Sequence, residues 1–205
     1  MRLIVLSPPQ EYPDEAHIVN ELFGSGLQTF HLRKPAFTRE TLERYINLIP
    51  AEYHRRIVIH FHYSLAKHYH FQGIHLTEKA RHSSSVHRII RELKEKSLST
   101  SFHSLEELRS HRRRYTYVFI SPVFDSISKP DYKSTFNPGS LRETIAALKK
   151  RNNYVPQLIA LGGIETKNIP TALSLGFAGV AVLGAVWESK EPVEAFRKIK
   201  TLTDR

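Results

Sequence analysis

The chain has 205 residues, of which 40% are hydrophobic and 24% charged, proportions that fit one globular domain with a sizeable core. It contains no cysteine, which excludes disulfide frameworks and thiolate metal sites. The formal net charge of +10 favours anionic partners, but Arg112-Arg113-Arg114 is the one dense basic run. We therefore expect small phosphorylated molecules as partners and no nucleic acid, which needs a clustered basic groove.

The N-terminal apolar run, from Met1 to Leu6, is stopped by Ser7-Pro8-Pro9 before it reaches the length of a signal peptide. No apolar stretch approaches the ~20 residues that cross a bilayer. We expect a cytoplasmic protein that binds no membrane, and we leave a homo-oligomer open.

Short β-rich runs alternate with helical runs through the first half of the chain. Strands are predicted at residues 2–6, 27–32, 57–59 and 73–76. A helix over 14–23 follows the first strand, and Thr38 caps a helix whose apolar residues recur at i, i+3, i+4 and i+7. A short helix is expected at 64–70, and the spacing of Val86, Ile89, Ile90 and Leu93 predicts another.

The alternation continues in the second half, with strands predicted at 99–101, 117–120, 157–161 and 179–182. Ser104 and Glu107 fit a capping box, in which each satisfies a free backbone donor of the other. A loop over 121–139 follows the sixth strand. The remaining helices are predicted around 141–148, from Thr166 to about Leu175, and over 192–202.

Eight strand–helix units in strict alternation predict a parallel sheet. Eight units in just over 200 residues indicate a small (β/α)8 TIM barrel, of class α/β, that forms a single domain over residues 1–205. The alternative is an open doubly wound sheet. Its dinucleotide-binding form needs a Gly-rich turn after the first strand, where Ser7-Pro8-Pro9 stands instead.

Glycines follow the last two strands, as Gly162-Gly163 and in Leu183-Gly184. Phosphate often lies at the loops after strands seven and eight of such barrels. Adjacent glycines let backbone N–H groups approach an anion closely. We interpret these residues as a backbone cradle for one phosphate, with tight turns alone as the alternative.

Polar side chains follow three other strands. His31 and Arg33 close the second strand, and the period of two directs them the same way, toward the barrel mouth. Arginine matches phosphate oxygens with two parallel donors. Further candidates are Ser101 at the end of the fifth strand and Ser126, Ser128 and Lys129 in the loop after the sixth. The alternatives are a helix start at Ser101 and a polar surface loop.

Histidine is frequent, at 12 residues. His60 and His62 follow the third strand two residues apart, so they are expected to share a face, and with His75 of the fourth strand they are candidate ligands of a transition metal. We predict no metal site, because separated histidines are more often structural or surface residues. No carboxylate stands beside these to orient their rings.

Six segments of the chain resemble the motifs of a known protein family and occur in the same order. They are 30–34 (FHLRK), 73–76 (GIHL), 101–107 (SFHSLEE), 121–129 (SPVFDSISK), 160–164 (ALGGI) and 179–185 (GVAVLGA). Together they resemble the motifs of the thiamine phosphate synthase and thiazole tautomerase family. The resemblance implies a (β/α)8 barrel and a transferase that couples a hydroxymethylpyrimidine pyrophosphate to a thiazole phosphate and releases pyrophosphate.

The resemblance also implies roles for residues at the strand ends. The resemblance implies that Arg33, Ser101 and Lys129 are the catalytic residues and bind pyrophosphate. The implied substrate-binding residues are His31, which stands at the family's glutamine, and His60, Ser126, Ser128, Gly162, Gly163, Leu183 and Gly184. The last four would bind the thiazole phosphate through backbone N–H groups.

Mg²⁺ is expected from the resemblance, and this cation prefers oxygen ligands. The family's Asn-Asp pair aligns with His60-Phe61 and its second acidic residue falls near Ala80, so both acidic ligands are absent here. Glu78 is the nearest carboxylate in the sequence. The family's motif lysine aligns with Pro35, and the neighbouring Lys34 is expected to point away. The pyrophosphate side therefore departs from the family pattern, whereas the phosphate side matches it.

Two other functions remain open. One is a thiazole tautomerase-like isomerase, which shares the barrel and needs no Mg²⁺; its histidine stands where this chain has Pro122. His60 or His103 would then have to act as acid and base. The other is a non-catalytic protein that binds a thiazole or thiamine phosphate.

Overall fold

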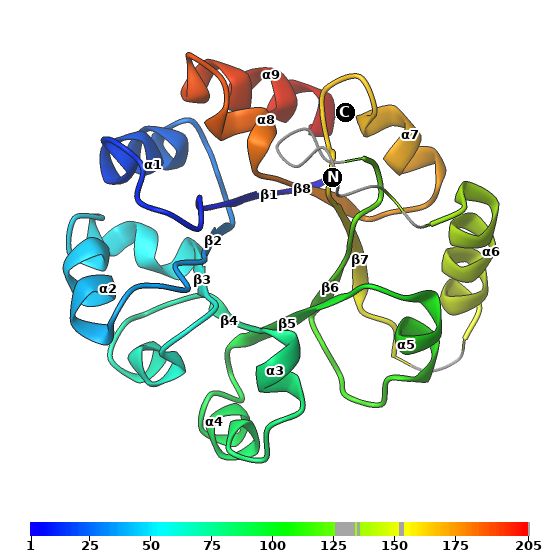
Figure 1. Cartoon of the computed structure of the whole chain (residues 1–205), viewed down its shortest axis with the longest axis horizontal. Coiled ribbons are helices and arrows are strands. Elements are labelled where there is room, and N and C mark those ends of the chain that lie inside the picture. Colours follow the sequence, from blue (N-terminus) through cyan, green and yellow to red (C-terminus); the bar gives the residue numbers. More distant parts are fainter. Residues whose placement is uncertain (126–133, 135, 152–153, 205) are drawn as a thin grey trace.

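The computed structural model describes residues 1–125, 134, 136–151 and 154–204, and eight parallel strands close into a barrel (Figure 1). The strands are β1 Arg2–Leu6, β2 Phe30–Leu32, β3 Ile57–Ile59, β4 Gly73–Leu76, β5 Ser97–Phe102, β6 Tyr117–Ile120, β7 Gln157–Leu161 and β8 Gly179–Val182. Closure comes from β1 and β8, which pair from Arg2↔Gly179 to Val5↔Val182. The predicted (β/α)8 fold is confirmed and the open sheet is excluded.

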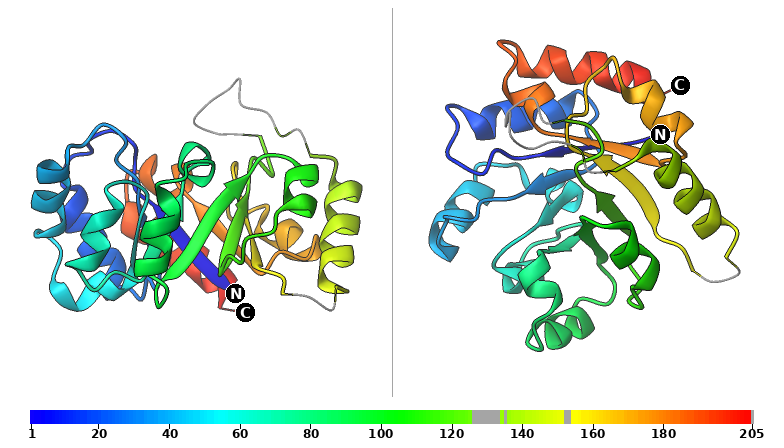
Figure 2. Two further views of the ribbon diagram at one scale, coloured as in Figure 1. Left: turned by 90° about the horizontal axis from the view of Figure 1, so that it is seen from below. Right: turned by 45° about the vertical axis from the view of Figure 1, so that its right-hand side comes forward.

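Helices form a ring outside the strands, as the view down the barrel and its two rotations show (Figures 1 and 2). The α-helices are α1 Glu15–Gly24, α2 Arg39–Ile46, α3 Glu78–Arg81, α4 Val86–Glu92, α5 Leu105–Ser110, α6 Pro138–Lys149, α7 Ile169–Ser174, α8 Gly184–Trp187 and α9 Pro192–Thr203. Two 3₁₀ helices, η1 Ala51–Arg56 and η2 Tyr63–Lys67, flank β3. The helices η1, α3 and α8 were not predicted, because four to six residues are too few to show a helical period.

Several predicted boundaries were wrong, and hydrogen bonds explain two of them. β2 begins at Phe30 rather than 27, because the Leu27 N–H donates to the Leu22 carbonyl and so belongs to the end of α1. α7 begins at Ile169 rather than Thr166, because the Asn168 side chain bonds Glu165 N and Gly163 O and fixes a loop there. The segment expected as a helix over 64–70 is the shorter 3₁₀ helix η2.

The apolar core has two parts. The larger lies between the strands and the outer helices. The smaller lies inside the barrel and consists of Ile4, Leu6, Tyr117, Phe119, Ile159 and Ala181, which come from β1, β6, β7 and β8. The period of two directs alternate residues of each strand inward.

The other half of the barrel interior is polar. His31, His75 and Ser99 are fully buried on β2, β4 and β5, and His60 is buried directly after β3. Register places them side by side, since His75 pairs with Ser99 and His31 pairs with Val58, two residues before His60. The interior is therefore divided into an apolar half and a histidine-lined half.

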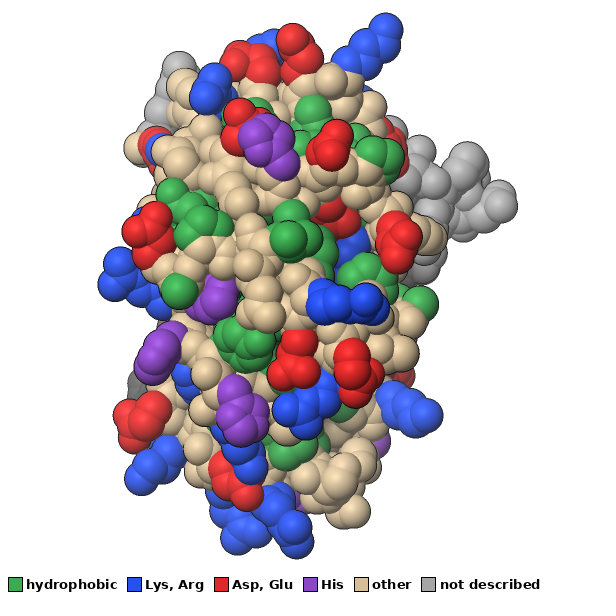
Figure 3. Space-filling model, turned by 90° about the vertical axis from the view of Figure 1, so that its left-hand side faces the viewer, with side chains coloured by type: hydrophobic (Ala, Val, Ile, Leu, Met, Phe, Trp, Pro, Cys, Tyr) green, Lys and Arg blue, Asp and Glu red, His purple; other side chains and the backbone are tan. Residues whose placement is uncertain are grey.

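The outer face around α1 and α2 carries mixed charge. Figure 3 shows Lys and Arg side chains interspersed with Asp and Glu there, without a continuous basic area on this face. Among the described residues, no helix is both long and apolar enough to cross a membrane.

Candidate functional site

Three histidines converge beneath the barrel mouth. His31 Nδ1 lies 2.9 Å from His60 Nε2, and His31 Nε2 lies 2.6 Å from the Tyr117 hydroxyl on the opposite side of the barrel. The His75 ring stacks on the His60 ring, with centroids 4.2 Å apart and planes 19° apart. His75 Nδ1 contacts Ser99 Oγ at 2.9 Å. These contacts connect β2, β3, β4, β5 and β6 through side chains in the barrel interior.

Burial determines the charge state of these rings. Burial, with the charges of Arg33 and Arg81, lowers the pKa of His75 to about 3. Burial, followed by the charges of neighbouring groups, holds the pKa values of His31 and His60 well below their ordinary value. All three imidazoles are therefore neutral at neutral pH, and each has one nitrogen able to accept a proton or bind a metal.

Arg33 and Ser101 lie at the edge of this cluster. Arg33 follows β2, is partly exposed, and its charge acts on His60 and His75. Its backbone N–H donates to Ser7 Oγ at 2.8 Å, which ties the strand end to the loop after β1. Ser101 Oγ lies 3.1 Å from His75 Nε2. The structure thus brings four predicted residues, Arg33, Ser101, His31 and His60, to one part of the mouth.

Lys34 points away from the mouth, as the sequence indicated. Its Nζ is buried outside the barrel, 2.5 Å from Glu15 Oε2 and 2.6 Å from the Gln10 carbonyl. Tyr45 donates to the other Glu15 oxygen at 2.9 Å. This pair between β2, α1 and α2 leaves Arg33 as the strand-end cation in this segment.

The glycines after β7 occupy conformations that other residues avoid. Gly162 and Gly163 have φ values of +92° and +62°. A Cβ atom would lie 2.7 Å from Pro122 at position 162 and 2.2 Å from the Asp125 carbonyl oxygen at position 163. Glycine is therefore required here by the turn and by close approach of the loop after β6, whether or not an anion binds.

Leu183 and Gly184 join β8 to the short helix α8, with Leu183 as its N-cap. Such an extra helix after strand eight frequently supports phosphate in these barrels, because its first N–H groups are free. A Cβ atom at Gly184 would approach only the flexible Glu188 carboxylate, at 3.0 Å. The sequence did not predict this helix, although Pro192 in the next segment marked the start of α9.

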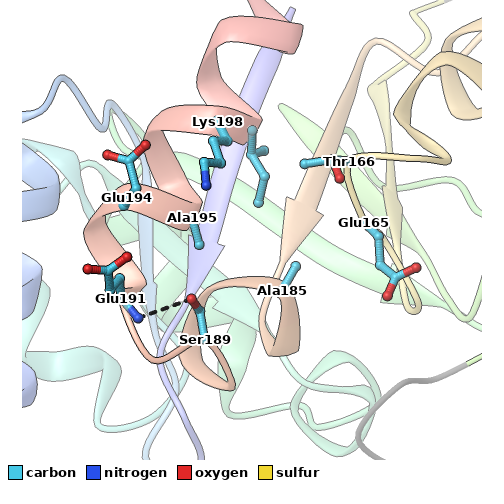
Figure 4. A pocket seen from close by; sticks show the side chains of 9 residues that line it. Glu165, Thr166, Ala185, Ser189, Glu191, Glu194, Ala195 and Lys198 are labelled. Atoms are coloured by element: carbon cyan, nitrogen blue, oxygen red, sulfur yellow. Dashed lines mark hydrogen bonds between the residues drawn. The ribbon is translucent and has the colours of Figure 1, made fainter.

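The hollow shown in Figure 4 lies beside these loops, between the segment after β7 and the helices α8 and α9. Its volume is about 270 Å³, and Glu165, Glu191, Glu194 and Lys198 line it. Three carboxylates against one ammonium disfavour a phosphate inside this hollow. The glycine backbone beside it remains the candidate for anion binding.

Three predicted residues, Ser126, Ser128 and Lys129, lie outside the described residues. The idea that His60 and His62 share a face was wrong. His62 adopts a left-handed conformation with φ of +51°, which ends the strand period, and its Nε2 contacts the Phe37 carbonyl. His103 Nδ1 contacts the Ser121 carbonyl at 2.8 Å instead of joining the cluster.

Tyr117 and Ser99 are parts of the site that no sequence motif marked. A usable signal was present, because polar residues at alternate positions of an apolar strand mark its inward face. His75 and His31 were noted, but their contact through the barrel interior depends on which strands face each other after closure.

A polar cluster beneath the C-terminal mouth and glycine turns after β7 and β8 place the protein among the small (β/α)8 enzymes, whose sites lie at this face. Comparisons with known proteins narrow the class. The family model described as thiamine monophosphate synthase matches residues 3–186. The chain therefore belongs to this family.

Individual relatives agree with the family match. The thiamine-phosphate synthase of Phocaeicola vulgatus is 26% identical over 152 residues, 74% of this chain and 72% of the relative. That of Geobacillus thermodenitrificans is 24% identical over 97% of this chain and 89% of the relative. The solved thiamine phosphate pyrophosphorylase of Bacteroides thetaiotaomicron is 33% identical, with a TM-score of 0.79, and covers 100% of this chain and 98% of that one. The function is that of a thiamine phosphate synthase-like transferase of thiamine biosynthesis.

Proposed function

We propose that this barrel joins a hydroxymethylpyrimidine pyrophosphate to a thiazole phosphate, with release of pyrophosphate, at the mouth formed by the ends of β2, β5, β7 and β8. The observation that carries the proposal is the family match over residues 3–186. The mouth adds a cation, a hydroxyl and glycine turns at the strand ends where the resemblance requires them.

In the proposed reaction the bond between the pyrimidine methylene and pyrophosphate breaks first, and the electron pair leaves with pyrophosphate. The pyrimidine stabilises the resulting cation, and the thiazole nitrogen captures it. Catalysis of this kind is mostly electrostatic, through donors aimed at the departing charge. Arg33 and Ser101 supply such donors beside the buried histidines, and Lys129 is proposed as a further cation.

The thiazole phosphate is proposed to bind Gly162, Gly163, Leu183 and Gly184. Backbone N–H groups in left-handed turns and at the start of a helix attract anions. Ser126 and Ser128 are proposed on the thiazole side, and His31 and His60 on the pyrimidine side. His31 is fully buried, so it is proposed to act through His60, whose Nε2 lies 2.9 Å from its Nδ1.

Mg²⁺ does not fit the donors of the described residues. His60 and Phe61 stand where the family has its Asn-Asp pair, and Ala80 in α3 offers no side-chain ligand. Glu78, the first residue of α3, is exposed rather than buried near the histidines. We therefore derive no step of the reaction through Mg²⁺. Small phosphorylated molecules are the proposed partners, and a homo-oligomer stays a prediction.

A coupling assay tests the reaction. The protein is incubated with both phosphorylated substrates, once with Mg²⁺ and once with EDTA, and thiamine phosphate is measured by chromatography. We expect thiamine phosphate and an equal amount of pyrophosphate. No product under either condition would overturn the synthase function and leave the isomerase or the non-catalytic binder. A tautomer assay on the thiazole phosphate alone separates those two.

The phosphate cradle is tested by Gly184→Asp, because the added side chain displaces only the flexible Glu188 carboxylate. Gly163→Asp is a poorer test, since its Cβ would collide with backbone. Titration with thiazole phosphate should show binding at least ~10-fold weaker, which corresponds to about 1.4 kcal/mol. Gly24→Asp makes the same charge change at the open C-terminal end of α1 and should bind like the wild type. Equal affinity for all three proteins would place the phosphate elsewhere.

A further inference from the structure

The buried histidines point to a metal site of a different kind from the one implied by the family resemblance. Mg²⁺ takes oxygen ligands, whereas the atoms gathered beneath this mouth are imidazole nitrogens. Among the residues that the structure describes, the ligand atoms of His31, His60 and His75 all lie within 4.8 Å of one another. We propose that these three histidines bind one transition-metal ion of the Zn²⁺ class.

The fold presents the three rings from one rigid surface. His31 lies in β2, His60 follows β3 directly and His75 lies in β4, so three adjacent strands each direct one imidazole into the barrel. Ligands on strands hold their positions better than ligands on loops. Three histidines with an open fourth position form a known type of zinc coordination, and imidazole also suits Co²⁺, Ni²⁺ and Cu²⁺.

The other nitrogens of two rings are already held by hydroxyl groups. His31 Nε2 contacts the Tyr117 hydroxyl at 2.6 Å, and His75 Nδ1 contacts Ser99 Oγ at 2.9 Å. Metal-bound histidines usually have their second nitrogen held in this way, which orients the ring. The sequence argued against a metal because no carboxylate accompanied the histidines. The folded barrel provides hydroxyl groups for the same task, which reverses that expectation.

Small movements convert the observed geometry into a coordination site. Zn–N bonds of about 2.0–2.1 Å in a tetrahedral site separate two ligand nitrogens by about 3.3 Å. The His31 and His60 nitrogens are 2.9 Å apart, so they would separate by a few tenths of an ångström. His60 and His75 are nearly parallel, so one ring must turn to aim at a shared ion. His60 is the candidate, since its ring makes one hydrogen-bond contact among the described residues, the one to His31.

The residues around the three histidines affect how tightly the site would bind a metal ion. Phe119 packs 4.8 Å from the His31 ring and 5.0 Å from the His75 ring, so the site has an apolar wall that excludes water on one side. Arg33 repels a bare dication, but it is partly exposed and its charge is screened by solvent. Ser101 Oγ, near His75 Nε2, can accept a hydrogen bond from a water on the open position of the ion.

Cobalt titration tests the site without any substrate, so its result is independent of the coupling reaction. Protein stripped with EDTA is titrated with Co²⁺, and the visible absorption of four- or five-coordinate cobalt is recorded; Zn²⁺ is then added. We expect one Co²⁺ per chain, displaced by an equal amount of Zn²⁺. The absence of a one-to-one endpoint, or displacement of Co²⁺ by Mg²⁺ as effectively as by Zn²⁺, would overturn the proposal.

Two variants, one directly after β3 and one in β4, locate the metal site. His60→Asn and His75→Gln should each weaken Co²⁺ binding by about 100-fold or more, since even changes behind the ligands cost about 10–100-fold. The control is His62→Asn, the same change two residues from His60, where asparagine tolerates the left-handed conformation. Circular dichroism checks that each variant is folded.

A more conservative variant tests the site even if the loss of a histidine unfolds the barrel. Tyr117→Phe keeps the ring and removes the hydroxyl that contacts His31. It should weaken Co²⁺ binding by about 10-fold with the chain still folded. Unchanged Co²⁺ binding in Tyr117→Phe and in whichever of His60→Asn and His75→Gln is folded would show that the ion binds elsewhere, and the proposal would fail.

Discussion

Arg33 and Lys34 are adjacent basic residues with opposite environments. Successive residues at a strand end face opposite sides of the sheet, so one side chain lies at the mouth of the barrel and the next lies behind the sheet. Arg33 remains partly exposed near His60 and His75, whereas Lys34 is buried against Glu15. A change at either position should therefore affect a different property of the protein.

We expect Arg33→Gln to reduce activity without reducing stability. A charge-assisted hydrogen bond to an anion is worth about 1.5–3 kcal/mol, so kcat/KM for coupling should fall by roughly 10- to 100-fold. Steady-state kinetics measure the loss, and Arg39→Gln, on the exposed side of α2, serves as the control. Equal kcat/KM for Arg33→Gln and the wild type would remove Arg33 from the site.

Lys34→Met should instead reduce stability. It leaves the Glu15 carboxylate buried without its cation, and breaking a buried pair costs about 3–5 kcal/mol. Burial already raises the pKa of Glu15 even with Lys34 present, which shows how strongly this location opposes a lone charge. Urea unfolding measures the change.

The double variant Lys34→Met/Glu15→Gln is the matched control for that prediction. The glutamine carries no charge and can still accept the hydrogen bond from the Tyr45 hydroxyl. It should recover much of the stability lost in Lys34→Met. If the double variant is no more stable than the single one, the lost packing of the lysine chain, rather than an unpaired carboxylate, explains the effect.

At the scale of elements, local signals for helix starts were confirmed where a side chain caps the helix. Thr38 accepts from Thr41 N at the start of α2, and Ser104 accepts from Glu107 N at the start of α5. Only one half of the predicted capping box is found in α5. The Glu107 carboxylate pairs with Arg81 on α3 instead, because a guanidinium competes successfully with a backbone N–H.

Thr38→Ala should lower the free energy of unfolding by about 1 kcal/mol, since alanine cannot accept from the free N–H groups of the first turn. Thr38→Ser keeps the oxygen and should change stability little. Denaturant unfolding of both variants at equal pH checks the prediction. A loss of the same size in the serine variant would assign the effect to the threonine methyl group instead of the cap.

On the scale of the whole molecule, the burial of histidines in one half of the barrel interior makes the free energy of unfolding depend on pH. The pKa of His75 is about 3 in the folded protein against 6.5 as the ordinary value. Between these values the unfolded chain binds a proton that the folded chain does not. Stability is therefore fully present above about pH 6.5 and falls as the pH drops, by roughly 1.4 kcal/mol per pH unit for this residue.

We expect the urea midpoint of EDTA-treated protein to fall between about pH 7 and about pH 5.5, in keeping with that sign. The His75→Gln variant should show a smaller dependence, because one buried imidazole is gone. The exposed His82→Gln serves as the control and should follow the wild type. A midpoint that rises on acidification would contradict the assignment of neutral buried histidines.

Much of the architecture was available from local patterns. Strands and helices were predicted from neighbours in the chain: apolar runs of four or five residues, helical spacing such as that of α4, and the cap at Thr38. The alternation of eight such strand–helix units then predicted the barrel. The boundaries of β2 and α7 depended on particular hydrogen bonds, those of the Leu27 backbone N–H and of the Asn168 side chain, which no local pattern records. Short helices such as α8 showed no period at all.

The sequence by itself determined the family, the barrel and the residue types at the strand ends, because these follow from order and spacing along the chain. Only the tertiary structure decided which of these residues meet. Closure of the barrel brings His31 opposite Tyr117, and the pairing of β3 with β4 stacks His60 on His75, although the members of each pair are separated along the chain. Contacts inside a barrel depend on register and closure of all eight strands, so they exist only in the folded molecule.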